Sequence, residues 1–335
     1  MKDDVVVDAR ALTRRFGETV AVDALDLRVR RAEIVGMLGH NGAGKTTTVR
    51  LLNGVLAATG GSATVLGLDP WRDGVRLRRR TGVATETPAV DDRLTGREGL
   101  TFFARIYGVP EVGLARRVDE VLGIFDLVDA ADERVGGYSR GMKQRLSLAR
   151  TLVHGPELLF LDEPTAGLDP VAARALDDQV RTLRASGATV LLCTHNLVQA
   201  QALCDRVVVL ERGRVVAEGT PAELARALAK GGHVVIDVEA GDSVDPITVL
   251  RRVPGLRSVE AHDAIAGDGA RRLRMQADDR AAVATAVDAL VRANVRVFAV
   301  EPEAPGLEDV YFALHERARS VVAPPTPPAA AGVES

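Results

Sequence analysis

The stretch GHNGAGKTTT has the residue types and spacing of a loop that binds phosphate. It fits the pattern G-x-x-x-x-G-K-[ST] over Gly39–Thr46, and it follows an apolar run and opens a predicted helix, as this pattern requires. Gly42 and Gly44 let backbone N–H groups turn inward around phosphate oxygens, and the helix N-terminus adds a positive dipole. Lys45 is then placed to reach the β- and γ-phosphates of a nucleotide, while Thr46 supplies a hydroxyl for Mg²⁺.

The residues of this loop that we expect to contact the nucleotide are consecutive: Gly39, His40, Asn41, Gly42, Ala43, Gly44, Lys45, Thr46 and Thr47. The alternative is an ordinary glycine-rich turn with a surface lysine, and the predicted strand–loop–helix context disfavours it. The sequence therefore predicts that this loop binds a nucleoside triphosphate with Mg²⁺.

Two carboxylates, Asp162 and Glu163, end the apolar run in LLFLDEP. Buried acids at the end of a strand need a cation or a proton as partner. Beside a phosphate loop, the first acid is expected to hold Mg²⁺, usually through water, while the second orients and polarises the water that attacks the γ-phosphate. Glu163 is therefore the predicted catalytic base. The alternative is a solvated Asp-Glu turn before Pro164.

His195 follows a third apolar run, TVLLC, at a position equivalent to those of Gly39 and Asp162. Parallel sheets bind ligands beyond the carboxyl ends of their strands, so the three strand ends can converge on one nucleotide. A lone histidine is more often structural than catalytic, but this position favours a contact with the γ-phosphate.

These runs belong to a predicted α/β fold of the P-loop NTPase type, with a mostly parallel sheet, over residues 1–220. The three buried strands are expected at Ile34–Leu38, Leu158–Leu161 and Thr189–Cys193. Between about 72 and 153 the strand signal fades, and helical periodicity predicts a helical insertion in the domain.

The composition shifts to short alternating segments after residue 220, which predicts a small α+β accessory domain over residues 221–318. Its order of strand, helix, strand, strand, helix, strand is that of a ferredoxin-like split βαβ module. Residues 319–335 are rich in Pro and Ala, and we expect this tail to be disordered.

The overall charge and hydropathy exclude some classes of protein. The formal charge is −3, which gives no global basic field for nucleic acid or anionic lipid, so no nucleic-acid partner is expected. No stretch approaches the roughly 20 apolar residues of a transmembrane helix, and the start lacks the apolar core of a signal peptide. The chain is therefore expected to be cytoplasmic unless a partner recruits it.

A second Ser-x-Gly turn, in YSRGMKQR, lies far downstream of the phosphate loop. Together with the phosphate loop, LLFLDEPTAGLDP and LLCTHN, in that order, it resembles the ATP-binding subunit of an ABC transporter over residues 5 to about 220. The resemblance implies two cassettes facing head to tail, so that Ser139 and Gly141 contact the γ-phosphate of ATP held by the other subunit. The residues alone also allow Ser139 simply to cap its own helix, and both can be true.

The same resemblance assigns further residues. It implies that Phe16 stacks on adenine, with a core Phe as the alternative, and that Asp169 lies at the dimer seam. It places Glu86 where the family usually has a glutamine that contacts Mg²⁺ and the membrane subunit. Arg140 and Met142 replace the more usual glycine and glutamine of the Ser-x-Gly motif, and Arg140 is predicted either to approach the trans phosphate or to project into solvent.

Among ABC subfamilies, the pieces AVDALDL, YSRGMKQRLSLA and LEDVYFAL are most similar to ABC-2-type exporters, of the daunorubicin resistance branch. This implies a homodimer, or a pseudo-symmetric dimer of ATP-binding subunits, that binds ATP and Mg²⁺. It also implies a separate ABC-2-type permease and a peripheral location on the cytoplasmic face of the plasma membrane. The exported substrate would be a drug, an antibiotic or another amphiphile, or else a lipid or polysaccharide. The alternatives are a soluble ABC-type ATPase without a permease and a regulatory subunit that hardly hydrolyses ATP.

Overall fold

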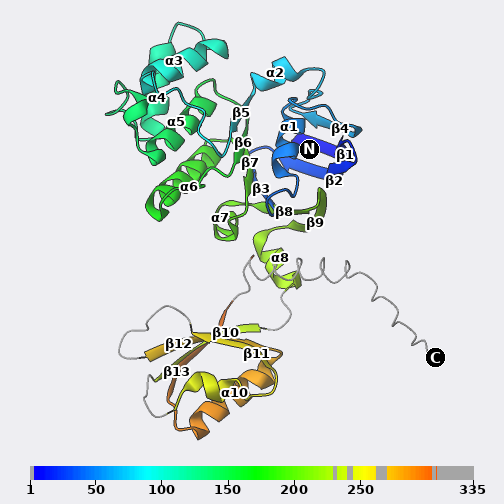
Figure 1. Cartoon of the computed structure of the whole chain (residues 1–335), viewed down its shortest axis with the longest axis vertical. Coiled ribbons are helices and arrows are strands. Elements are labelled where there is room, and N and C mark those ends of the chain that lie inside the picture. The colour runs from blue at the N-terminus through cyan, green and yellow to red at the C-terminus, as the bar shows by residue number, and fades with distance from the viewer. Residues whose placement is uncertain (1–3, 229–231, 240–243, 262–269, 304–306, 308–335) are drawn as a thin grey trace, which may run out of the picture. The chain divides into compact units, whose positions relative to one another are not determined.

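The computed structural model describes residues 4–228, 232–239, 244–261, 270–303 and 307 (Figure 1). The chain divides into two compact units, Met1–Pro221 and Ala222–Ser335. The tail at 319–335 that was expected to be disordered lies outside the described residues. Within those residues, no helix has the length and apolar character needed to cross a membrane.

A six-stranded sheet of order β5-β6-β7-β3-β8-β9 forms the centre of the first unit. Its strands are β3 (Ile34–Leu38), β5 (Thr81–Ala84), β6 (Leu158–Asp162), β7 (Thr189–Thr194), β8 (Arg206–Glu211) and β9 (Arg214–Gly219). All neighbours are parallel except β8 and β9. The three predicted strands become the adjacent strands β6, β7 and β3, and every residue in them is buried, as expected of apolar runs covered on both faces. The predicted fold class is confirmed.

A separate antiparallel sheet of order β2-β1-β4 packs against the phosphate-loop side of this unit. Its strands are β1 (Val5–Phe16), β2 (Thr19–Arg30) and β4 (Gly60–Val65). These three strands were not predicted from the sequence. Along β2, buried and exposed side chains alternate, because one face covers the core and the other does not.

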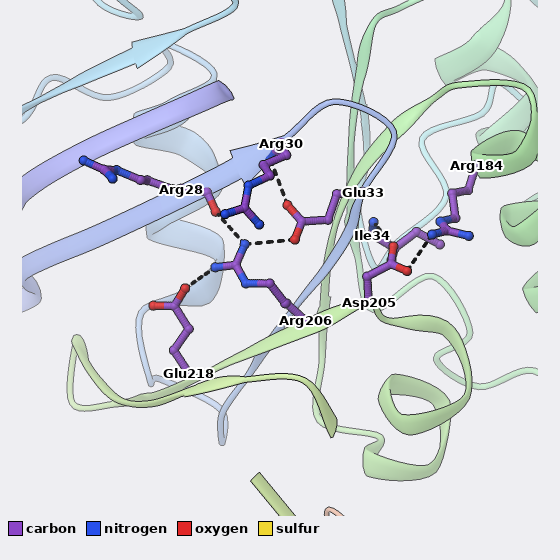
Figure 2. Close-up of polar contacts among 8 residues, drawn as sticks. All are labelled: Arg28, Arg30, Glu33, Ile34, Arg184, Asp205, Arg206 and Glu218. Carbon is purple, nitrogen blue, oxygen red and sulfur yellow. Dashed lines mark hydrogen bonds and ion pairs between the residues drawn. The ribbon is translucent and has the colours of Figure 1, made fainter. Parts of the chain in front are cut away.

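Arg206, at the start of β8, links the two sheets (Figure 2). Its guanidinium donates to Glu33 Oε1 at 2.9 Å and to the backbone carbonyl of Arg28 at 3.3 Å, and it also pairs with Glu218. Glu33 is only 8% exposed, and its other oxygen accepts from the backbone N–H of Arg30 at 2.8 Å. A buried carboxylate needs such partners, and here they fix the turn from β2 into β3, which leads to the phosphate loop.

Within the described residues of this unit, helices connect the strands from β3 to β8. They are α1 (Lys45–Leu52), α2 (Gly74–Arg78), α3 (Gly96–Ile106), α4 (Leu114–Ile124), α5 (Arg140–Leu152), α6 (Pro170–Ala185) and α7 (Leu197–Leu203). Helices α3, α4 and α5 gather on the β5 side of the sheet (Figure 1).

The helical insertion predicted for about 72–153 needs one correction, because this interval also contains β5, a strand of the central sheet. Its main helices, α3 to α5, begin only at Gly96. Four residues are too few for a periodic signal, and the strand contains Gly82, which is usually unfavourable in strands. A Cβ on Gly82 would lie 2.3 Å from the carbonyl oxygen of Thr151, so close packing against α5 explains the glycine.

The second unit contains an antiparallel sheet of order β11-β12-β10-β13 with its own apolar core. Its elements are α8 (Pro221–Leu228), β10 (Gly232–Glu239), α9 (Pro246–Leu250), β11 (Leu256–Ala261), β12 (Ala270–Ala277), α10 (Arg280–Arg292) and β13 (Val297–Glu303). From β10 on, their order and sheet topology are those of a split βαβ module.

Candidate functional site

The loop between β3 and α1 takes a shape that only glycine allows at two positions. Gly42 and Gly44 have φ angles of 87° and 107°, in a region that L side chains rarely adopt. A Cβ on Gly44 would also lie 2.5 Å from the carbonyl oxygen of Ala21. Gly44 precedes α1 as its N-cap and makes no side-chain cap, so the positive end of this helix is available to an anion.

Lys45 lies with its ammonium inside this loop and is only 6% exposed. Its Nζ donates to the carbonyl oxygens of Gly39 at 2.5 Å and His40 at 3.3 Å, and it lies 3.7 Å from Glu163 Oε1. An ammonium so desolvated interacts strongly with any phosphate that enters the loop, because little water screens the pair.

Thr46 and Asp162 face each other across the site. The Thr46 hydroxyl donates to Asp162 Oδ2 at 2.7 Å. Burial raises the pKa of the Asp162 carboxyl, and the nearby charges of Glu163 and Glu86 add to this. The hydrogen bond from Thr46 and the charge of Lys45 oppose it without reversing the direction. A hydroxyl oxygen next to an acidic oxygen fits Mg²⁺, which is usually held by one or two carboxylates together with substrate phosphates.

Replacing Asp162 by Asn should stabilise the nucleotide-free chain. The pKa of the Asp162 carboxyl is raised in the folded chain, so the folded chain binds the carboxyl proton more tightly than the unfolded chain does. The free energy of unfolding that this contributes is present at low pH and is lost as the pH rises through the folded-state pKa. Asn keeps the shape without the charge, and we expect melting about 2–4 °C higher at pH 7, measured by calorimetry in EDTA. The difference in melting temperature between the variant and the unmodified chain should shrink toward pH 4. A variant that melts at a lower temperature than the unmodified chain at pH 7 would contradict the idea that burying the charged Asp162 carboxylate destabilises the fold.

Glu163 follows β6 in a strained conformation, with φ at 50°. Its backbone N–H donates to the carbonyl of Cys193 at 2.8 Å, and Thr194 Oγ1 donates to Oε2 at 3.4 Å. The other oxygen, Oε1, lies 2.8 Å from His195 Nδ1, but the two are not aligned as a hydrogen bond, and Oε1 has no hydrogen-bond partner among the described residues. A buried carboxylate oxygen in this state is suited to accept a hydrogen bond from water.

Lys45, Thr46, Asp162 and Glu163 line a pocket of about 280 Å³. Its lining residues come from the phosphate loop, from the ends of β5 and β6 and from β2: Ala21, His40, Asn41, Gly42, Gly44, Lys45, Thr46, Thr47, Glu86, Asp162 and Glu163. Glu86, predicted only from a resemblance, thus lies in the same pocket as Asp162. Sequence reasoning missed Ala21 and Thr194, and neither carries a local signal that could have found it.

Two predicted loop residues lie outside the pocket lining. The side chain of Ala43 is fully buried in the apolar core, and its N–H donates to the carbonyl of His40 at 3.1 Å. Gly39 is tightly enclosed, because a Cβ there would lie 2.6 Å from the carbonyl oxygen of Leu210, and it takes part through its own carbonyl, which accepts from Lys45. Both residues shape the loop rather than present a side chain to a ligand.

Phe16, at the end of β1, is 46% exposed, so the alternative that it is a core residue is wrong. The guanidinium of Arg14 lies 4.5 Å from its ring centroid. Phe16 does not line the described pocket. An exposed ring remains able to stack on a base.

Ser139 caps α5, since its Oγ accepts from the N–H of Met142 at 3.2 Å. Neither Ser139 nor Gly141 lines the pocket of this chain. Asp169 likewise caps α6, accepting from the N–H groups of Val171 and Ala172 at 2.9 Å each. Ser139 and Asp169 therefore hold the starts of neighbouring helices.

A phosphate loop, a Thr–Asp pair and an acid at the ends of parallel strands of one sheet define a P-loop nucleoside triphosphatase. Residues 22–166 match the ABC transporter family. The chain belongs to this family of ATPases, as an ATP-binding subunit of the drug-resistance branch. The predicted family and enzyme class are confirmed.

The relatives that support this assignment match most of the chain. It is 38% identical over 313 residues to daunorubicin resistance ATP-binding protein DrrA2 of Streptomyces coeruleorubidus, covering 93% of this chain and 95% of that protein. It is 34% identical over 317 residues to doxorubicin resistance ATP-binding protein DrrA of Mycobacterium tuberculosis, covering 93% and 94%. A fluoroquinolones export ATP-binding protein of the same species is 44% identical over 227 residues, covering 67% of this chain and 74% of that protein.

Solved structures match about two thirds of the chain. An ATP-binding subunit of an ABC transporter is 32% identical with a TM-score of 0.61, covering 66% of this chain and 92% of that chain. The cbiO1 protein of Clostridium perfringens is 28% identical with a TM-score of 0.62, covering 66% and 90%.

Proposed function

We propose that this chain is the motor subunit of a membrane exporter, which dimerises around two ATP molecules and drives a separate permease. The observation that carries the proposal is the convergence of Lys45, the Thr46–Asp162 pair and Glu163 on one pocket. Each group has the chemistry that one part of ATP hydrolysis needs.

The residues divide the work of hydrolysis. The phosphate loop and Lys45 hold the β- and γ-phosphates, as the positive end of α1 and the buried ammonium favour. Thr46 and Asp162 would hold Mg²⁺, with Glu86 as a further oxygen donor, and the ion supplies charge neutralisation on the phosphate oxygens. Glu163 accepts a proton from the attacking water. His195, next to Glu163 and 65% exposed, would contact the γ-phosphate.

Dimerisation supplies the missing part of each site. Ser139 and Gly141 lie outside the pocket lining of their own chain, so a second copy facing head to tail would bring them to the ATP. Although Ser139 Oγ accepts from Met142, its hydroxyl hydrogen can still be donated to a phosphate oxygen. Because ATP would then contact both copies, losing the γ-phosphate removes contacts across the interface and shifts the population to open dimers.

The substrate and the partner are inferred from the relatives. Proteins that resemble this chain over nearly its full length are named for resistance to daunorubicin and doxorubicin, and another is named for export of fluoroquinolones. We infer that the exported compound is a drug or another amphiphile. The permease would be a separate ABC-2-type membrane protein that holds this chain at the cytoplasmic face of the membrane.

Co-expression with a candidate ABC-2-type permease from the same genome tests the proposal. We expect the chain to sediment with membranes only when the permease is present, and cells making both to accumulate less doxorubicin than cells making the permease with the Glu163→Gln variant. An active ATPase that stays off membranes and leaves accumulation unchanged would favour an ATPase without a permease. Membrane association without drug efflux would contradict a drug as the exported compound and favour a lipid or a polysaccharide.

A further inference from the structure

Arg140, where the family usually has glycine, lies against the loop that follows Glu163. Its Nη2 is 3.5 Å from the carbonyl oxygen of Ala166. A Cβ built on Gly167 would lie only 2.1 Å from that nitrogen and 2.2 Å from Cζ, so the guanidinium fills the space that a side chain at 167 would need. Arg140 is exposed, but its guanidinium lies against this loop.

Gln144 makes a second contact between the same helix and the same loop. It is 3% exposed, and its Nε2 donates to the carbonyl oxygen of Pro164 at 2.8 Å. Arg140 and Gln144 are four residues apart on α5, so both side chains lie on one helix face. The first turn of α5 is thus attached to this loop at two points.

The loop itself is short and internally bonded. Its N–H groups at Ala166 and Leu168 donate to the carbonyls of Glu163 at 3.0 Å and Thr165 at 3.1 Å, respectively. Because these turns hold the loop together, a displacement at Ala166 or Gly167 also displaces the backbone of Glu163, where the φ angle is already strained.

We propose that Arg140 is a positioning residue that couples the Ser139 turn to Glu163 within one chain. Ser139 would contact ATP bound to the other copy, whereas Glu163 acts on ATP bound to its own chain. Through Arg140, the presence of ATP at one site would therefore affect the position of Glu163 at the other site. The proposal rests on the head-to-tail dimer of the proposed function. A glycine at position 140 has no side chain to make the contact, so the arginine strengthens coupling in this chain relative to the more usual motif.

A double-mutant cycle on Arg140→Ala and Gly167→Ala tests the link. Each change separates the guanidinium from the loop, the second because its new methyl group occupies the same space. We expect each to lower kcat about 3- to 10-fold, change the KM for ATP less than about 2-fold and bring the Hill coefficient for ATP toward 1. The double variant should be no slower than Gly167→Ala alone, because residues in contact do not act additively.

Two further variants and a control complete the experiment. Arg140→Lys keeps a donor near the carbonyl of Ala166 and should recover part of kcat. Arg174→Ala removes an exposed arginine from the neighbouring helix α6 and should leave all three parameters unchanged. If Gly167→Ala fails to fold, because φ at 167 is +68°, Gly167→Asn takes its place in the cycle, since Asn tolerates this conformation better.

The outcomes separate this inference from the function on which it rests. A Glu163→Gln chain that stays monomeric with Mg·ATP by light scattering contradicts the proposed dimer and the link together. A dimer in which the two changes are additive, or in which Arg140→Ala raises KM while kcat is kept, contradicts the link alone. The second pattern would mean that Arg140 binds the trans phosphate.

Discussion

Replacing Glu163 by Gln is expected to lower ATP turnover by about 10²- to 10³-fold while ATP still binds. Gln is close in shape and tolerates the same backbone, but its neutral amide cannot accept the proton of the attacking water. Hydrolysis then stops with ATP in both sites, so we expect a stable dimer with Mg·ATP. Steady-state phosphate release and size-exclusion chromatography with and without Mg·ATP measure the two effects.

Glu157→Gln is the matched control, because Glu157 is an acid that pairs with Arg80 and lies outside the pocket. It should keep wild-type turnover and should not trap a dimer. If Glu163→Gln instead retains full turnover, Glu163 is not the base. Lost turnover without a trapped dimer would keep the base assignment and contradict the assembly around two ATP molecules.

Replacing Lys45 by Ala is expected to weaken ATP binding by about 10- to 100-fold, or about 1.4–2.8 kcal/mol. The change removes the one ammonium that lies inside the phosphate loop, where burial makes its attraction to phosphate strong. Isothermal titration with Mg·ATP on a hydrolysis-deficient Glu163→Gln background measures the loss directly. The rise in melting temperature on adding Mg·ATP should shrink in parallel.

Lys143→Ala is the control for charge. Lys143 pairs with Asp92 at 2.8 Å and lies outside the pocket, so its removal should leave ATP affinity unchanged. An unchanged affinity in Lys45→Ala, in a chain that still melts cooperatively, would contradict the assigned role of the loop. If Lys45→Ala weakens the binding of AMP as much as that of ATP, Lys45 does not contact the β- and γ-phosphates.

The phosphate loop and the acids that follow β6 could be predicted from the sequence because each is local. Lys45 and Thr46 stand next to the glycines that shape their loop, and Asp162 and Glu163 directly end a strand whose apolar run is unmistakable. The resemblance added Glu86, which the structure places in the pocket. The antiparallel strands β1, β2 and β4 were not predicted, although apolar and polar residues alternate over Leu25–Arg30 of β2. The short strand β5 was missed because four residues carry too little periodic signal.

Only the tertiary structure decided which distant groups meet. Strand order places β7 between β6 and β3, and the structure brings His195 to Glu163 and Glu163 to Lys45 of the phosphate loop. The same packing sets Arg140 on Gly167, where the sequence left a choice between solvent and the trans phosphate. The sequence determined by itself the chemistry that this protein carries, since motifs and apolar runs are properties of neighbouring residues. The meeting of those groups depends on how strands far apart in the chain pair, and no local pattern encodes that.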